Sequence, residues 1–218
     1  MITAVLWGSP QGQDAFGGDL CVANAARASF GKFKAVMDGK DESLIDYLTR
    51  GDNEHTSPFR HNFARFSCRA PIFVARQLAK HQVGMAWSET SLRYVKAGDV
   101  WFPQTWREQS EDKKQGSGGP IKAQAKADLA YANAVEAALS AYEELLRLGV
   151  CREQARAVLP TGVYTEWKWS GTLQAWAHMC KLRCAPDAQE ETRELAEQIR
   201  TELIRIWPVA MAALGVTA

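Results

Sequence analysis

The segment "NFARFSCRAPIFVARQ", residues 62–77, constrains the fold most strongly because its periodicity changes within one short stretch. From residue 64 to residue 70, small or apolar side chains alternate with Arg and Ser, which is typical of a strand with one buried face. Pro71 follows, and proline is favoured at the first position of a helix, where its missing N–H costs nothing. The sequence therefore predicts a half-buried strand that leads directly into a helix over residues 71–82.

The other periodic segments predict mainly helices. Residues 19–37 are expected to form one helix, with Phe30 and Phe33 near its buried face. Residues 41–50 begin with an aspartate that suits a helix cap. Further helices are expected near residues 121–148, 151–160, 171–183 and 187–206, a short buried strand at 2–7, and an extended segment at 91–95. This order indicates an α+β fold with a central sheet and flanking helices.

Only one segment looks like a long connection. Residues 106–120, "WREQSEDKKQGSGGP", are polar and rich in glycine, so they are expected to form a flexible surface loop. No internal repeat and no second boundary is visible, and 218 residues suit one domain. Residues 1–218 are therefore expected to form a single domain.

The charge balance and the cysteine content exclude several classes of protein. The chain has 26 basic and 25 acidic side chains, a balance that does not suit a general nucleic-acid binder. No apolar run approaches the length of a membrane span, and the N-terminus lacks the pattern of a signal peptide. Five cysteines without a disulfide framework or zinc-ligand spacing favour a reducing cytoplasm and no metal site. We therefore expect a cytoplasmic protein (host cytoplasm if the gene is viral).

The stretch "LAKHQVGMAWSETSLRY", residues 78–94, gathers charged and polar groups around a bend expected at Gly84. Outside it, Arg156 and Arg183 add guanidinium groups, which present paired donors to phosphates and carbonyls. Each of these side chains taken alone is more often a surface or core residue. No dinucleotide fingerprint, phosphate-binding loop or nucleophile elbow occurs. The residues by themselves thus predict an α+β domain with an anion-binding pocket near the bend.

The same stretch resembles the flavin-dependent thymidylate synthases. In that family a helix ends in Arg-His-Arg, and a later segment reads Asn-Glu, one residue, Ser, one residue, Arg-Tyr. In this chain the helix ends in Lys80-His81-Gln82, and the later segment, Ser88 to Tyr94, reads "SETSLRY". Four more segments match in order over about residues 45–205. They are "HTSPFRHNF" (55–63), "APIFVARQ" (70–77), "ARAVLPTGVYTEW" (155–167) and "LRCAPDAQEE" (182–191).

The resemblance implies a reaction and an assembly. Family members form homotetramers and methylate dUMP at C5 to give dTMP. Methylenetetrahydrofolate provides the carbon, FAD provides the hydride and NADPH reduces the flavin. The family uses no cysteine nucleophile, which agrees with the absence of an obvious activated cysteine here.

Positions carried over from the family give the expected site. Arg183 would be the catalytic residue, because a cation at N3 and O2 of the pyrimidine makes C5 more nucleophilic. The expected nucleotide-binding residues are Gln77, Lys80, Glu89, Thr90, Ser91, Leu92, Arg93, Arg156 and Arg183. The expected contacts to flavin or folate are His55, Ser57, Lys80, His81, Gln82, Glu89, Thr172, Gln174 and His178.

The chain departs from the family pattern mainly on the flavin side. Lys80 keeps the charge of the first motif arginine but loses its fork, and Gln82 loses the charge of the second. Gln174 and His178 replace a frequent arginine and a frequent asparagine. Three interpretations remain open: an ordinary flavin-dependent thymidylate synthase, a relative that methylates or hydroxymethylates dUMP or dCMP with altered use of flavin, and an inactive nucleotide-binding paralogue.

Overall fold

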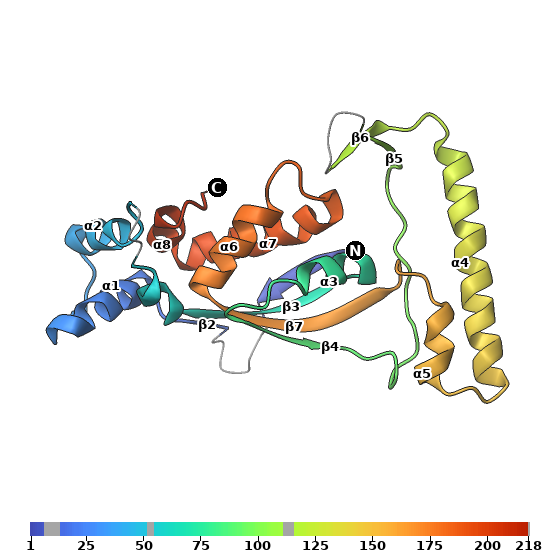
Figure 1. Cartoon of the computed structure of the whole chain (residues 1–218), viewed down its shortest axis with the longest axis horizontal. Coiled ribbons are helices and arrows are strands. Elements are labelled where there is room, and N and C mark those ends of the chain that lie inside the picture. Colours follow the sequence, from blue (N-terminus) through green and yellow to red (C-terminus); the bar gives the residue numbers. More distant parts are fainter. Residues whose placement is uncertain (7–13, 52–54, 111–115, 218) are drawn as a thin grey trace.

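In the computed structural model, a twisted antiparallel sheet forms the centre of the molecule (Figure 1). The structure describes residues 1–6, 14–51, 55–110 and 116–217. The sheet has the order β1-β3-β7-β4, and the short β2 also pairs with β3. Its strands are β1 (Thr3–Leu6), β2 (Ala15–Phe16), β3 (Phe63–Pro71), β4 (Met85–Glu89) and β7 (Tyr164–Thr172).

The two longest strands, β3 and β7, lie side by side and share one buried face. They pair over their whole length, from Phe63 opposite Thr172 to Pro71 opposite Tyr164. Residues 64, 66, 68 and 70 of β3 are buried, as the alternation predicted. In β7 the buried positions are 165, 167, 169 and 171, and this strand was missed by the sequence prediction. The two central strands therefore set the inward face for the whole sheet.

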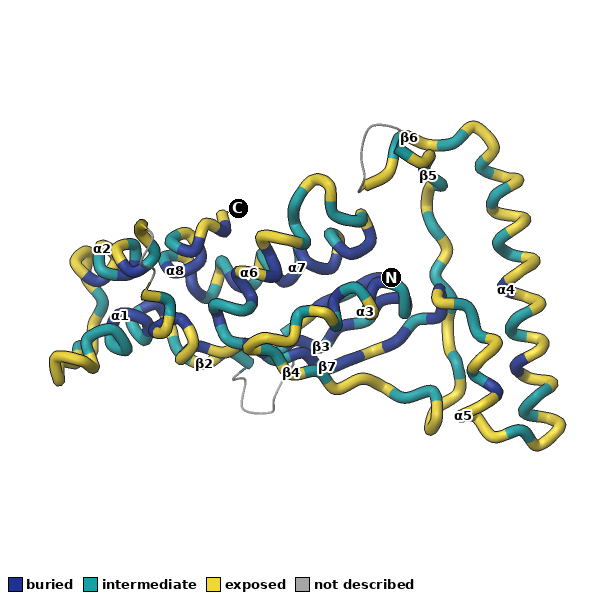
Figure 2. The backbone as a smooth tube through the Cα atoms, viewed as in Figure 1, coloured by how far each residue is buried: buried dark blue, intermediate teal, exposed yellow. Residues whose placement is uncertain are grey.

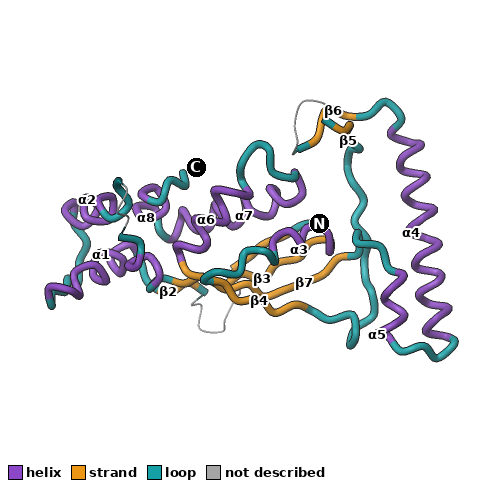
Figure 3. The backbone as a smooth tube through the Cα atoms, in the orientation of Figure 1, coloured by secondary structure: helices purple, strands orange, loops and turns teal. Residues whose placement is uncertain are grey.

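Helices α3 (Ile72–Leu78), α6 (Leu173–Arg183) and α7 (Glu190–Ile206) cover the buried face of the sheet (Figure 3). The core between them holds Trp167, Trp169 and Trp176, which are at most 2% exposed. Burial of each such ring stabilises the fold by roughly 1.5–3 kcal/mol. The opposite face carries Arg65, Ser67, Arg69, Glu166 and Lys168, so it is polar. Figure 2 shows the buried positions concentrated under the helices.

Two further groups of helices lie at the ends of the sheet. At one end are α1 (Asp19–Arg27), α2 (Gly39–Tyr47), α8 (Pro208–Ala213) and the short η1 (Ala28–Phe30) and η2 (Ser57–Arg60). At the other end the long α4 (Gln124–Arg147) lies beside α5 (Arg152–Ala155) and η3 (Arg156–Val158), at a distance from the covering helices (Figure 1). On α4 only Val135 and Tyr142 are buried. The α+β prediction is confirmed.

The helix expected over residues 19–37 is wrong at its C-terminal half. Helix α1 and η1 end at Phe30, and Gly31 follows with φ = +62°. Asn24 then donates to the Lys34 carbonyl at 2.8 Å and accepts from the Lys34 amide at 3.0 Å, which folds the chain back. As a result Phe30 and Phe33 are 77% and 80% exposed instead of buried.

Four other elements differ from the sequence prediction. Within residues 106–120, β5 (Arg107–Gln109) and β6 (Ser117–Pro120) pair as a hairpin instead of forming only a loop, while residues 111–115 lie outside the described residues. The extended segment is β4, not residues 91–95, because β4 pairs with β7 and the chain then turns. Pro71 ends β3 and does not begin the helix. Strand β1 is buried on one face only, since Val5 is 57% exposed.

Candidate active site

The first cluster of candidate residues lies where α3 and α6 end; we call Gln77, His81 and Arg183 the α3–α6 cluster. Nε of Arg183, the last residue of α6, donates to Nε2 of His81 at 2.9 Å. Gln77 and Arg183 both line a cavity of about 560 Å³, together with the turn that follows α6 and Gly116 of the hairpin. The sequence-predicted nucleotide residues Gln77 and Arg183 are thus brought together.

The Gly84 bend packs against the start of α6. Gly84 has φ = +73°, and a Cβ there would lie 3.0 Å from Oγ1 of Thr172 and 3.1 Å from Cβ of Ala175. A side chain at this position is therefore both strained and crowded. The bend turns the chain from α3 into β4, which begins beside the last residues of β7.

Burial changes the pKa values and the hydrogen bonding of the polar groups in the α3–α6 cluster. Burial, followed by the positive charge of Arg183, lowers the pKa of His81 to about 4, so the imidazole is neutral and accepts the hydrogen bond. Burial also lowers the pKa of the Arg183 guanidinium. Oε1 of Gln77 is buried and has no protein partner. An unsatisfied buried acceptor is costly, so a ligand donor there is stabilising.

The second cluster surrounds the segment after β4; we call Ser91, Arg93, Arg152 and Arg156 the α5 cluster. Nη1 of Arg152 donates to the Tyr94 carbonyl at 2.7 Å and holds the turn against α5. Nη2 of Arg93 lies 3.1 Å from a carboxylate oxygen of Glu153, and Nε of Arg156 donates to the Glu153 backbone carbonyl at 3.3 Å. The Arg93–Glu153 pair is exposed and therefore weak, so an incoming anion displaces it at low cost.

The two clusters lie apart within one chain. Helices α3 and α6, which carry the first cluster, cover the middle of the sheet, whereas α5 lies at the end of the molecule beside α4 (Figure 1). Strand β4 separates Gly84 from Thr90, which donates its backbone N–H to the Glu166 carbonyl at 2.8 Å. In this arrangement the Thr90 amide is already used and is not directed at a phosphate.

The expected flavin-side residues gather around the start and middle of α6. Gln174 and His178 line a cavity of about 250 Å³ together with Thr49, Thr56 and Lys181. The ring centroids of His178 and His81 are 6.3 Å apart, so this group lies next to the α3–α6 cluster. Gln174 is engaged, because its Oε1 accepts from Nε of Arg60 at 2.6 Å. Thr172 caps α6 by accepting from the Ala175 amide at 3.2 Å, which gives its hydroxyl a structural partner.

The remaining expected residues lie at edges and turns. Glu89 accepts from the Thr165 hydroxyl at 2.8 Å and from Nε1 of Trp87 at 3.0 Å, which fixes its carboxylate at the edge of the sheet. Lys80 and Gln82 are exposed beside His81, and Leu92 is half-buried in the turn. His55 and Ser57 are exposed around the start of η2.

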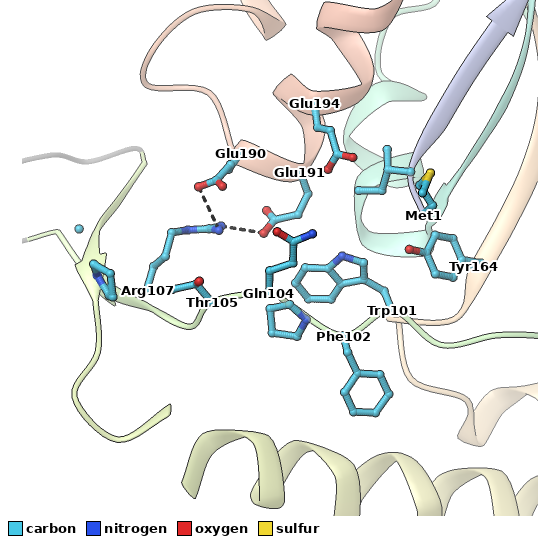
Figure 4. A pocket seen from close by; sticks show the side chains of 14 residues that line it. Met1, Trp101, Phe102, Gln104, Thr105, Arg107, Tyr164, Glu190, Glu191 and Glu194 are labelled. Carbon is cyan, nitrogen blue, oxygen red and sulfur yellow. Dashed lines mark hydrogen bonds and ion pairs between the residues drawn. The ribbon is translucent and has the colours of Figure 1, made fainter. Parts of the chain in front are cut away.

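A cavity of about 730 Å³ contains none of the expected site residues (Figure 4). It lies between α7, the first residues of the chain and the extended segment before β5. Arg107 spans it, with ion pairs of 3.1 Å to Glu190 and 2.7 Å to Glu191. Because Glu194 adds a third carboxylate, this lining suits a phosphorylated ligand poorly, and its charged groups serve to attach the hairpin to α7.

Two residues near the clusters were missed by the sequence reasoning. Arg152 positions the turn at residues 91–94, and Lys181 lines both the 560 Å³ and the 250 Å³ cavities. A signal for Arg152 was present, since it lies one helical turn before Arg156. Lys181 gives no such signal, because a lysine near a helix C-terminus is common on any exposed surface.

Comparison with known proteins gives one consistent family. Residues 14–209 match the family model described as thymidylate synthase complementing protein. A flavin-dependent thymidylate synthase of Thermus thermophilus is 40% identical over 202 residues, which cover 92% of this chain and 73% of that protein. The enzyme of the same name from Treponema pallidum is 38% identical over 207 residues, 92% of this chain and 66% of that protein.

A solved structure agrees with these relatives. The crystal structure of the UMP/dUMP methylase PolB from Streptomyces cacaoi, bound with 5-Br dUMP, superposes with a TM-score of 0.86 at 32% identity and covers 99% of this chain and 95% of that one. The fold is that of a nucleotide-modifying enzyme. The chain belongs to the thymidylate synthase complementing protein family, the flavin-dependent thymidylate synthases, and the expected resemblance is confirmed.

Proposed function

We propose that this protein methylates dUMP at C5 to give dTMP, with methylenetetrahydrofolate as the carbon donor. Membership of the flavin-dependent family supports FAD as the cofactor and NADPH as its reductant. The observation that carries the proposal is that Gln77 and Arg183 line one cavity and that Oε1 of Gln77 has no protein partner. The active-site chemistry requires no cysteine or metal ligand from this chain.

The cavity of the α3–α6 cluster is complementary to the edge of a uracil ring. The Nη groups of Arg183 donate to N3 and O2 of the base once N3 has lost its proton to solvent, and the Gln77 side chain lines the same cavity. Nε of Arg183 stays bonded to His81, which holds the guanidinium in one orientation. The negative charge on N3 and O2 makes C5 more nucleophilic toward the one-carbon donor, and neutral bound dUMP lacks this charge, so the contact with Arg183 strengthens toward the transition state.

The flavin-side residues fit part of an FAD. Their amide, imidazole, ammonium and hydroxyl groups, from Gln174, His178, Lys181 and Thr56, suit phosphate oxygens and the polar edge of a flavin ring. The 250 Å³ cavity is smaller than a dinucleotide, so the rest of the cofactor would lie against the neighbouring surface or a partner copy. When bound, FAD supplies the hydride that completes the methyl group.

The phosphate of dUMP is assigned to Ser91, Arg93 and Arg156 of the α5 cluster. Because this cluster and the α3–α6 cluster lie apart in one chain, a complete site takes one cluster from each of two copies. The long α4, with only two buried residues, offers a surface for that contact. We therefore infer a homotetramer, as the family resemblance implied.

In the described part of the chain no helix combines the length and apolarity that crossing a bilayer requires. For the location of the protein we propose the cytoplasm.

The test is product analysis by mass spectrometry. The purified protein is incubated with methylenetetrahydrofolate and dUMP, dCMP or UMP, each with and without FAD and NADPH. We expect dTMP from dUMP only when FAD and NADPH are both present. Hydroxymethyl-dUMP, or a product formed without flavin, would replace the proposal with the hydroxymethylase interpretation. Binding of dUMP without any product would indicate an inactive paralogue.

A further inference from the structure

The last turn of α6 carries two cysteines that the proposed reaction does not use. Cys180 lies in α6 and Cys184 is the residue directly after Arg183, so the two cysteines are one helical turn apart, and the Cys184 amide donates to the Cys180 carbonyl at 2.9 Å. Both line a cavity of about 180 Å³ together with Lys181 of α6 and Arg200 of α7. Cys180 is 1% exposed and Cys184 is half-buried, so a small reagent reaches Cys184 first.

We propose that Cys180 and Cys184 form an oxidisable pair, in which a hydroperoxide converts the two thiols into a disulfide that displaces Arg183 and stops turnover. The loss of turnover rests on the proposed function, whereas formation of the disulfide does not. In the first step the Cys184 thiolate attacks one peroxide oxygen, which gives a sulfenic acid, and the other oxygen leaves and is protonated to an alcohol, or to water when the oxidant is hydrogen peroxide. In the second step the Cys180 sulfur attacks the Cys184 sulfur, and the sulfenic oxygen leaves as water.

The surroundings favour attack by Cys184. The hydrogen bond from Cys180 lowers the pKa of the Cys184 thiol more than burial raises it, and Arg200 acts in the same direction. The hydrogen bond to Cys184, and then burial, raise the pKa of Cys180, which keeps it protonated until the second step. Glu197 faces the pair from α7 and opposes Arg200, to which it is bound at 2.6 Å. A partly accessible thiol with a lowered pKa next to a second thiol is the usual setting of an oxidation-sensitive cysteine.

The other cysteines lack this combination. Cys68 lies in β3 at 1% exposure, and burial raises its pKa. Burial also raises the pKa of Cys21. Cys151 is exposed at the start of α5, at the opposite end of the molecule from α6 (Figure 1). Cys151 therefore serves as an internal control for general oxidation.

The disulfide cannot form without moving the last turn of α6. In an α-helix, residues four apart have Cα and Cβ atoms about 6 Å apart, whereas a disulfide requires Cβ atoms about 3.8 Å apart. The Cys184 amide now donates to the Cys180 carbonyl at 2.9 Å and closes this turn. Because Arg183 lies within the turn, closing the gap between the sulfurs shifts its Nε away from His81.

The experiment treats the full-length protein with hydrogen peroxide and compares wild type with Cys180→Ala, Cys184→Ala and Cys151→Ala. Peptide mass mapping should find a Cys180–Cys184 disulfide in wild type and Cys151→Ala. Hydrogen exchange over residues 181–187 should rise in these two proteins only. Turnover should fall by about tenfold or more, since small displacements of a positioned group are costly, and dithiothreitol should restore it. Cys180→Ala and Cys184→Ala each remove one sulfur of the disulfide, so the two variants test the same prediction independently.

Three results would overturn the proposal. The first is oxidation at Cys151 with no Cys180–Cys184 disulfide. The second is a disulfide that leaves hydrogen exchange over residues 181–187 unchanged. The third is equal inactivation of wild type and the two α6 variants. A protein that is inactive before treatment contradicts the proposed function alone, because mass mapping and hydrogen exchange still decide whether the pair is oxidised.

Discussion

Nε of Arg183 donates a hydrogen bond to Nε2 of His81 at 2.9 Å, although the two residues are 102 positions apart in the chain. The bond joins the last residue of α6 to the turn after α3, and it requires a neutral imidazole as acceptor. Both residues come from segments that resemble the family's motifs. The contact therefore links the expected catalytic cation directly to the expected flavin-side histidine.

The first prediction concerns pH. The pKa of His81 is lowered to about 4 from an ordinary value of 6.5, so the unfolded chain takes up a proton at a higher pH than the folded protein does. The stability from this group is complete above pH 6.5 and is lost as pH falls from 6.5 toward 4. His81→Gln keeps an acceptor but does not titrate. Urea unfolding should show a smaller loss of stability between pH 7 and pH 5 in His81→Gln than in wild type; equal losses would contradict the assignment.

The second prediction separates catalysis from binding. Arg183→Ala should abolish dTMP formation while dUMP affinity stays measurable, because the contact strengthens mainly in the transition state. Arg183→Lys should restore little, since a point charge does not address two acceptors at once. Arg156→Ala is the comparison, and it should weaken dUMP binding first. Calorimetry and product assays give the two quantities; near-normal turnover of Arg183→Ala would refute the role.

The third prediction concerns Arg152 as a positioning residue. Arg152→Ala removes the hydrogen bond to the Tyr94 carbonyl and frees the turn that holds Ser91 and Arg93. KM for dUMP should rise by roughly tenfold, from the loss of about 1–1.5 kcal/mol of hydrogen bonding, with a smaller change in kcat. Arg152→Lys should recover part of the affinity. Arg205→Ala, which breaks the exposed pair with Glu202 on α7, should change neither constant.

The fourth prediction tests whether one site uses two copies. Arg183→Ala and Arg93→Ala should each lack activity. If the two clusters come from different subunits, a mixed tetramer contains some sites in which both clusters are intact. Co-expression of the two variants should therefore restore part of the wild-type turnover, and light scattering should give a tetramer. An active monomer, or a mixture that stays inactive, would exclude the shared site.

The fifth prediction concerns flavin affinity. Lys80 and Gln82 stand where the family has arginines, so this chain lacks paired guanidinium contacts to the cofactor. Each charged hydrogen bond is worth about 1.5–3 kcal/mol, so the double variant Lys80→Arg, Gln82→Arg should bind FAD at least about tenfold more tightly. Titration of FAD-free protein measures this, with Lys40→Arg on α2 as the control. An unchanged affinity would show that these positions do not contact FAD.

The sequence by itself determined the strand–helix unit of β3 and α3, the long α4 and the family. Alternation over residues 64–70 and helical spacing over residues 121–148 are local patterns, and they fix which face of each element is apolar. The motif segments identified Gln77, Ser91, Arg93, Arg156 and Arg183 as candidates because the resemblance covers them in order. β7 shows the same alternation, with Thr165, Trp167 and Trp169 buried and Glu166 and Lys168 on the other face, so the rule that predicted β3 also applies to this strand.

Only the tertiary structure decided which candidates meet. His81 and Arg183 meet at 2.9 Å although they are 102 positions apart, and antiparallel pairing of β4 with β7 brings the Gly84 turn beside the first turn of α6. The same pairing carries Ser91 and Arg93 away from them, toward α5. Hydrogen bonding then separated two residues that the sequence analysis had both named as site candidates. Thr172 caps a helix, whereas Oε1 of Gln77 is buried without a protein partner. Such distinctions depend on long-range pairing and burial, which no local sequence pattern encodes.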